Sequence, residues 1–212
     1  MSNTGLFVRL RAKAGKEREV EEFLRSALAL AEKEHGTVTW FAMQFGRGEY
    51  GIFDSFADDE ARLAHLDGAM ARALRDRAGE IFETPPRMQQ LNVLADKLPT
   101  ESTPTNTRGV LLKFRAKAGR ELQVEQFLRD ARALVMKEQS TTAWFAIRTD
   151  DGEYGIFDVF PDGASRFAHL IGHVPRELAK RALKLLGSVP SLEMLNVQAE
   201  KLGPSAGYAT RH

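Results

Sequence analysis

The chain repeats itself after 104 residues, and this repeat constrains its fold more than any other feature. Shifting the sequence by 104 positions aligns Leu6 through Leu98 with Val110 through Leu202 without a gap, and 45 of the 93 aligned positions are identical. Solenoid repeats have periods of roughly 20 to 50 residues and need three or more copies. A period of 104 residues in two copies therefore predicts two whole domains with one fold.

The composition of the segment between the copies marks a boundary. The stretch PTESTPTNTRG is rich in Pro, Thr, Ser and Asn, which cannot extend an apolar pattern. We therefore expect a first domain over residues 1–98, a linker over 99–109, a second domain over 110–203 and a flexible tail over 204–212. With 43% hydrophobic and 28% charged residues, the chain has the balance of an ordinary globular protein with a normal core.

Hydrophobic periodicity predicts the same order of elements in each copy. In the first copy, alternation in GLFVRLRAK predicts a strand, and apolar residues at spacings of three and four predict a helix over 17–34. Two strands over 37–45 and 49–56 follow, joined by a short turn with glycine. Helical segments continue to about residue 82, and a last strand lies near 88–95. This βαββαβ order predicts a ferredoxin-like domain with an antiparallel four-stranded sheet and helices on one face.

Adjacent aromatic residues on one strand predict how the two domains combine. Trp40 and Phe41 are neighbours, as are Trp144 and Phe145, so each pair must point to opposite faces of its sheet. The helices of a domain cover one apolar face, and the other face needs a partner. We therefore predict an α+β chain whose two ferredoxin-like domains form an intramolecular dimeric α/β barrel of eight strands.

Charge and composition disfavour several classes of function. Thirty basic and 29 acidic residues give a net charge of +1 without a sustained basic run, which disfavours binding to nucleic acid. No apolar run approaches the roughly 18 residues that span a bilayer, so we expect no membrane partner and a cytoplasmic protein. The chain has no cysteine, and neither a phosphate-binding loop nor a metal-ligand spacing is visible. We accordingly expect neither a metal nor a cofactor.

Three motifs resemble those of a known family. The stretches LFVRLRAKAGKEREVEEFL and YGIFDSFADDEA, with AHL at His65, resemble the antibiotic biosynthesis monooxygenase family of dimeric α/β barrels, which includes quinol and anthrone monooxygenases. The resemblance implies oxygenation of an electron-rich aromatic substrate without a metal or flavin. Its haem-degrading members place an asparagine where Val8 stands here, which disfavours haem degradation. Many quinol-oxidising members carry a second histidine, which His173 matches in the second copy and Ala69 does not in the first.

Two kinds of residue are candidates for the site, and each has a structural alternative. His65 and His169 either bond to a backbone carbonyl or act catalytically, since an imidazole with a pKa near neutrality can orient a phenol or take its proton. Trp40 and Trp144 are either simple core residues or the wall of an aromatic pocket. We expect each histidine and tryptophan to flank a cavity between the sheet and the helices.

The acidic and phenolic residues of the motif GIFD are further candidates for contact with the substrate. Asp54 and Asp158 fall within apolar strands, where an unpaired carboxylate is costly. We expect each to pair with an arginine of the first strand, namely Arg11 and Arg115, and the alternative is an activated general base. The tyrosines that begin the same strands, Tyr50 and Tyr154, either cap the mouth of the pocket or cover the sheet edge, and we favour the edge.

Three functions agree with these observations. The first is a cofactor-independent monooxygenase for a quinol-like or polycyclic phenolic substrate, which it would deprotonate to an anion that reacts with dioxygen. The second is a binding protein for a small apolar aromatic ligand. The third is a structural or interaction module, in which the pseudo-dimeric chain forms a homo-oligomer.

Overall fold

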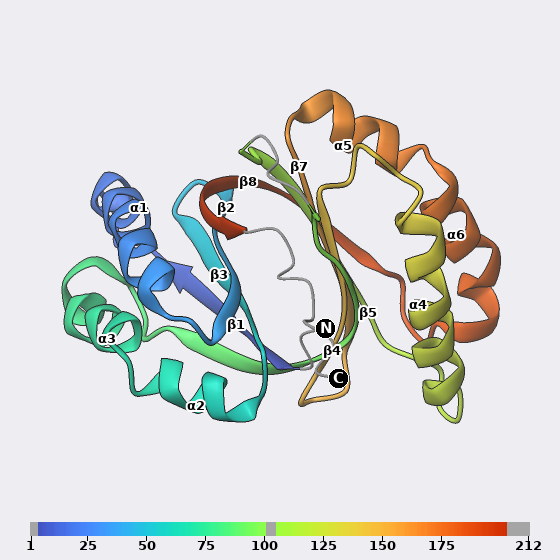
Figure 1. The fold of residues 1–212 in the computed structure, drawn as a ribbon, viewed down its shortest axis with the longest axis horizontal. Helices are drawn as coiled ribbons and strands as arrows, with labels where there is room; N and C mark the ends of the chain where they lie inside the picture. Colours follow the sequence, from blue (N-terminus) through green and yellow to red (C-terminus); the bar gives the residue numbers. More distant parts are fainter. Residues whose placement is uncertain (1–3, 101–104, 203–212) are drawn as a thin grey trace, which may run out of the picture.

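Two successive runs of strands and helices make up the structure, a computed structural model that describes residues 4–100 and 105–202 (Figure 1). The first run contains β1 (Thr4–Arg11), α1 (Glu17–Lys33), β2 (Thr37–Gly46), β3 (Glu49–Phe56), α2 (Asp59–Leu66), α3 (Ala69–Ile81) and β4 (Arg87–Lys97). The second contains β5 (Arg108–Phe114), α4 (Glu121–Val135), β6 (Ala143–Thr149), β7 (Tyr154–Phe160), α5 (Gly163–Leu170), α6 (His173–Leu185) and β8 (Ser191–Leu202). Both runs have the predicted βαββαβ order, with the second helical segment divided into two helices.

The strands form one closed antiparallel barrel. Their order around it is β1-β3-β2-β8-β5-β7-β6-β4. Strand β4 pairs with β1 of its own half and with β6 of the other half, and β8 likewise pairs with β5 and β2. Helices α1 to α3 lie outside one side of the barrel and α4 to α6 outside the other (Figure 1). The predicted intramolecular dimeric α/β barrel is thereby confirmed, and its last strands join the two halves.

Phenylalanine side chains fill the interior of the barrel. Phe41, Phe53, Phe145 and Phe157 are all buried there, and the Phe53 ring lies 4.6 Å from that of Phe157 and 4.9 Å from that of Phe145, centroid to centroid. Such tilted and edge-on aromatic pairs add to the stabilisation that burial of the rings provides. The barrel interior is a packed core at this level, so its centre has no room for an aromatic ligand.

A second core lies between the sheet and the helices in each half. In the first half Trp40 packs there with the buried face of α1, which includes Val20, Leu24 and Ala27, and with Met70 of α3. Trp144 holds the same place in the second half. Trp40 and Phe41 therefore point to opposite faces of the sheet, as the alternation of strand side chains requires.

Part of the predicted linker is anchored to the barrel. The backbone N–H of Asn106 and its side-chain amide both donate to the carboxylate of Glu200, at 2.8 and 2.9 Å, and Asn106 is buried. Residues 101–104 of the linker and the whole of the predicted tail, 204–212, lie outside the described residues. Division of the chain into domains at residues 98 and 110 stays a prediction.

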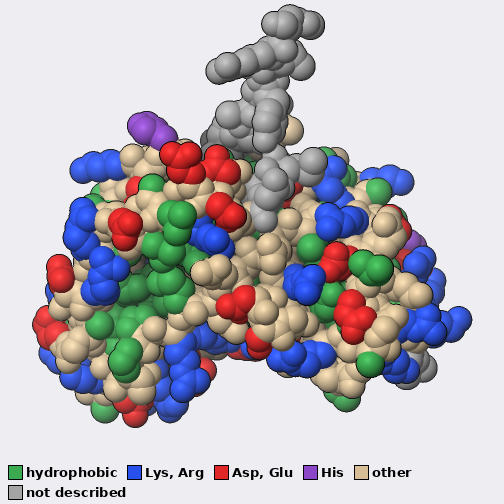
Figure 2. Space-filling model, turned by 90° about the horizontal axis from the view of Figure 1, so that it is seen from below, with side chains coloured by type: hydrophobic (Ala, Val, Ile, Leu, Met, Phe, Trp, Pro, Cys, Tyr) green, Lys and Arg blue, Asp and Glu red, His purple; other side chains and the backbone are tan. Residues whose placement is uncertain are grey.

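The underside of the molecule carries charges of both signs. Figure 2 shows lysine and arginine side chains interspersed with acidic ones over this face, and hydrophobic side chains gathered in a hollow of the half that contains α1 to α3. This view agrees with the nearly balanced composition of 30 basic and 29 acidic residues. A face with such mixed charges does not produce the uniformly positive electrostatic potential that attracts a polyanion.

Candidate functional site: a buried Glu–His–Asp cluster in each half

Each predicted histidine lies between two carboxylates. His65 is buried in the last turn of α2, with its Nδ1 2.6 Å from Oε2 of Glu34 and its Nε2 3.9 Å from Oδ2 of Asp54. In the second half the corresponding distances from His169 are 2.7 Å to Glu138 and 3.7 Å to Asp158. The shorter contact is a charge-assisted hydrogen bond, and the longer one is an electrostatic contact only.

Local structure fixes the histidine and the glutamate. Helix α2 begins at Asp58, whose side chain accepts a hydrogen bond from the backbone N–H of Ala61 at 2.8 Å. Helix α1 ends at its C-cap residue Glu34, which brings that carboxylate to the end of α2. Thr37 donates its hydroxyl to the same Glu34 oxygen at 2.8 Å. The histidine therefore has one nitrogen held in place and the other facing Asp54.

The aspartate and the tryptophan are neighbours across two strands. Trp40 of β2 lies directly opposite Asp54 of β3, and both are essentially without exposure to solvent. Among the described residues, Oδ1 of Asp54 and Nε1 of Trp40 have no hydrogen-bond partner, and the same two atoms of Asp158 and Trp144 have none. Buried polar atoms almost always have a hydrogen-bond partner in folded proteins. The same exception occurs at equivalent residues of the two halves, which makes the tryptophan and the aspartate of each half candidate functional residues.

Burial and neighbouring charge shift the titration of all three groups. Burial raises the pKa of Asp54 to about 7, against the lowering effect of the His65 charge. Burial lowers the pKa of His65, but its hydrogen bond to Glu34 and the charges of Asp54 and Glu34 outweigh this, and the net shift is upward. For Glu34, burial acts to raise the pKa, and the bonds from His65 and Thr37 bring it below its usual value. The cluster can therefore hold or exchange a proton near neutral pH.

A lysine from the opposite half completes each cluster. Lys201 of β8 lies opposite Trp40 in the strand register, and its Nζ donates to the carbonyl oxygens of Ala31 and Glu34 at 3.0 and 2.6 Å. Lys97 of β4 lies opposite Trp144 and donates to the carbonyl oxygens of Val135 and Glu138. These carbonyls are at the C-terminus of α1 or α4, where a cation interacts favourably with the helix dipole.

The predicted pairing of the aspartates with arginines is wrong. Arg11 pairs with Glu83 at 2.9 Å, and Arg115 pairs with Asp151 at 3.1 Å. The strand register places Asp54 opposite Leu6, five residues before Arg11, and an odd separation puts two side chains on opposite faces of a sheet. Asp54 therefore faces the helices, where His65 takes the place that the arginine was expected to have.

The tyrosines and His173 lie apart from the histidine cluster. Tyr50 and Tyr154 are buried against the helices, and the Tyr50 hydroxyl donates to Glu21 at 3.1 Å. The sheet-edge interpretation is wrong, because the closed barrel of the described strands leaves no edge for them to cover. His173 begins α6 with 65% of its side chain exposed, and its Nε2 lies 4.0 Å from Glu177 rather than beside His169.

Sequence reasoning missed the residues that surround the histidine. These are Glu34, Thr37 and Lys201 in the first site, and Glu138, Thr141 and Lys97 in the second. All three positions are identical between the two copies, as are the tryptophan, aspartate and histidine positions. Comparing the charged and polar residues that both copies share would therefore have pointed to them.

The cluster is closed in this conformation. Trp40 is fully buried and His65 retains 7% of its exposure, so the predicted position between sheet and helices holds packed side chains. Pockets of about 370 and 560 Å³ lie elsewhere, beside Arg9 and beside Arg47 respectively. Over residues 4–100 and 105–202, no group of histidines and carboxylates is arranged to hold a metal ion. No helix in the same ranges is long and apolar enough to cross a membrane.

Comparison with known proteins supports the predicted fold. No protein-family model and no curated protein matches the chain. A solved structure from Fusobacterium nucleatum, described as a "putative monooxygenase", is 16% identical over 95% of each chain, with a TM-score of 0.80. A ferredoxin-fold protein from Listeria monocytogenes, described as related to antibiotic biosynthesis monooxygenases, is 8% identical over 93% of this chain and 95% of its own, with a TM-score of 0.55.

A third solved structure is more similar in sequence over a shorter range. This protein of unknown function from Nitrosomonas europaea is 47% identical over 47% of the present chain and 96% of its own, with a TM-score of 0.46. At the identities of the two full-length matches, structural likeness establishes the fold and not the chemistry. The resemblance seen in the sequence is confirmed at that level, and the chain has the dimeric α/β-barrel fold of proteins related to the antibiotic biosynthesis monooxygenases.

Proposed function

We propose that the protein is a cofactor-independent monooxygenase that oxygenates a quinol-like or polycyclic phenolic substrate at the two buried clusters. The observation that carries this proposal is the buried Asp54 carboxyl group, whose pKa of about 7 suits a general base at neutral pH. The same arrangement recurs at Asp158. Likeness of the fold to that of a "putative monooxygenase" supports the proposal without carrying it.

The geometry favours the aspartate over the histidine as the group that takes the proton. Nδ1 of His65 is hydrogen-bonded to Glu34, and its Nε2 lies 3.9 Å from Asp54, so the imidazole is oriented toward the aspartate. Oδ1 of Asp54 is unpaired among the described residues and lies beside the indole of Trp40. In this mechanism Asp54 takes the proton, the imidazolium of His65 stabilises the resulting anion, and Glu34 orients the imidazole.

Dioxygen and the substrate together supply the atoms of the reaction. For an anthrone, loss of a proton from the reactive carbon gives an electron-rich anion, which attacks dioxygen at that carbon. Loss of water from the hydroperoxide then leaves a carbonyl, so a CH₂ group and O₂ become C=O and H₂O. The substrate provides both electrons that reduce the second oxygen atom, and the reaction requires no external reductant.

Catalysis at this site requires the helices to open. Trp40 and Asp54 are covered by α1, α2 and α3, so an aromatic substrate reaches them only after a helix moves away from the sheet. Helix α2 is the shortest of these, and His65 is its one buried residue. A short element with so little buried surface is the part of the fold most easily displaced.

The test is oxygen uptake with a panel of quinols and anthrones. The double variant Asp54→Asn, Asp158→Asn removes both bases while keeping side-chain volume, and we expect turnover to fall by about 10²- to 10⁴-fold. The matched control Asp130→Asn changes an exposed aspartate of α4 and retains full activity. Full activity in a folded double variant would exclude these aspartates as bases.

A second candidate is a binding protein or structural module without turnover. Complete burial of Trp40 and Trp144 favours it, because side chains that anchor a core need no ligand. A shift in tryptophan fluorescence with added aromatic ligand, without oxygen uptake, would support the binding protein. No response to any aromatic compound in either assay would leave the structural role.

A further inference from the structure

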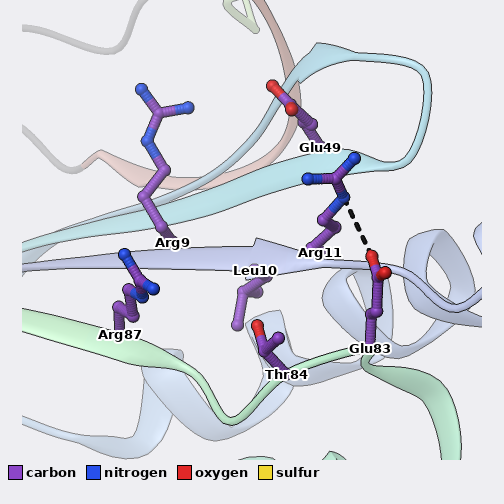
Figure 3. Close-up of a pocket in the computed structure, with 7 residues that line it drawn as sticks. All are labelled: Arg9, Leu10, Arg11, Glu49, Glu83, Thr84 and Arg87. Carbon is purple, nitrogen blue, oxygen red and sulfur yellow. Dashed lines mark ion pairs between the residues drawn. The ribbon is translucent and has the colours of Figure 1, made fainter.

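The barrel end at the carboxyl terminus of β1 holds a pocket of about 370 Å³ that the proposed reaction does not use (Figure 3). Phe7 points into the barrel, and alternate residues of a strand share one face of the sheet. Arg9 and Arg11, two and four residues after Phe7, therefore lie on the same face as Phe7. The arginines of the pocket therefore lie on the barrel side of the sheet, whereas Asp54 and His65 lie on the helix side.

Two arginines of neighbouring strands line this pocket side by side. Arg9 of β1 lies directly opposite Arg87 of β4 in the antiparallel register. Figure 3 shows both side chains extending from the same side of the strand pair, with Arg11 further along β1 and Leu10 on the other side. Like charges directly opposite on neighbouring strands are destabilising unless an anion offsets their repulsion.

The partners of the arginines differ. Arg9 is held by an ion pair with Glu193 of β8, and its guanidinium lies 3.7 Å from the centroid of the Phe45 ring. Arg11 pairs with Glu83 at 2.9 Å. Within the described part of the chain, the side chain of Arg87 forms no ion pair or hydrogen bond. The guanidinium of Arg9 is thus held in place, and the neighbouring guanidinium of Arg87 has free hydrogen-bond donors.

The second copy shows that the barrel does not need this pair. The positions of Arg9, Glu83 and Arg87 correspond to Lys113, Gly187 and Ser191, so no like-charge pair exists there. Lys113 faces Ser191 in the register of β5 and β8. The pocket with neighbouring arginines is therefore a feature of the first half alone, and a structural requirement of the repeated fold does not explain it.

We propose that this pocket binds the carboxylate of a small organic acid between Arg9 and Arg87. Three arginines and two glutamates line it, and Glu193, the partner of Arg9, is also paired with Lys113 at 3.4 Å, so the group as a whole carries one positive charge and suits a monoanion. The planar fork of a guanidinium matches the two oxygens of a carboxylate, and an anion between the arginines removes their repulsion. Each chain would have one such site, although it carries two copies of the domain.

Isothermal titration calorimetry with benzoate tests the proposal, with benzamide as the neutral match. We expect one benzoate per chain, no binding of benzamide, and weaker binding at higher salt. Arg87→Ser installs the residue of the second copy and should weaken benzoate binding about tenfold, the factor for one lost charge-assisted hydrogen bond. The exposed Arg120→Ser is the matched control and should bind as the unaltered chain does.

Thermal unfolding separates loss of the site from loss of the fold. Because Arg87→Ser relieves a like-charge contact, its midpoint without ligand should equal or exceed that of the unaltered chain. At one benzoate concentration, the midpoints of the unaltered chain and of Arg120→Ser should rise equally, and that of Arg87→Ser should rise less. Two benzoates per chain, equal binding of benzamide, tighter binding of inorganic phosphate, or undiminished benzoate binding by a folded Arg87→Ser would each overturn the proposal.

Discussion

Replacing Asp54 by asparagine should make the protein more stable at alkaline pH, by an amount that follows from its burial. The pKa of Asp54 is raised from 3.8 to about 7 in the folded protein, so the folded state binds its proton more tightly than the unfolded state between these values. Stability from this group is therefore present at acidic pH and lost as pH rises toward 7. One pKa unit corresponds to about 1.4 kcal/mol, so the loss between pH 5 and 8 is about 2 to 3 kcal/mol.

Urea unfolding followed by tryptophan fluorescence at a series of pH values measures this effect. Apart from His65, whose pKa the charge of Asp54 raises, titration of the rest of the chain largely cancels in the difference between Asp54→Asn and the unaltered protein. That difference should grow in favour of the variant between pH 5 and 8, and Asp158→Asn should behave alike because burial also raises its pKa to about 7. A difference that stays flat, or that grows in favour of the unaltered protein, would refute the assignment of a protonated buried aspartate.

Four other substitutions test the packing and the link between the halves. Lys201→Met removes the donor to the carbonyls of Ala31 and Glu34 and should cost about 1 to 2 kcal/mol in urea unfolding, against no loss for the exposed Lys137→Met. Gly5→Ala places a Cβ 2.6 Å from the backbone oxygen of Asp54 and should lower the melting temperature. Gly79→Ala has open space in α3 and should gain about 0.5 to 1 kcal/mol. Phe53→Ala in the barrel centre should cost about 3 to 5 kcal/mol.

The fold could be predicted because its determinants are local patterns that occur twice. Alternation around Trp40 and Phe41 required two apolar faces, and the structure covers one with helices and the other with the opposite half. The pattern did not show that β4 pairs with β6, nor that β8 pairs with β2. Hydrogen bonding between edge strands depends on the relative position of the halves, which residue periodicity within one half does not specify.

The candidate site could be predicted only in part, because its members come from distant elements. Trp40, Asp54 and His65 stood out as residue types that are unusual for their surroundings. Glu34 ends an amphipathic helix and looked like one more charged surface residue, and Lys201 lies 167 residues further along the chain. The pairing of Asp54 with Arg11 failed because it rested on strand adjacency alone, without the register that separates the two side chains.

The two copies have kept one set of charged residues and changed another, and both sets lie on the same barrel. Glutamate, aspartate, histidine and lysine are identical in the two helix-side clusters, and each lysine reaches across to the other half. At the barrel end, Arg87 and Glu83 of the first copy correspond to Ser191 and Gly187. Surface charges on an exposed rim can change with little effect on stability, whereas a buried charge that loses one partner is strongly destabilising. Identity of the buried clusters is therefore expected from stability as well as from catalysis, and activity of the asparagine variants distinguishes the two. Arg87, opposite Arg9, has no such structural explanation, because the other half of the same barrel has Ser191 in its place.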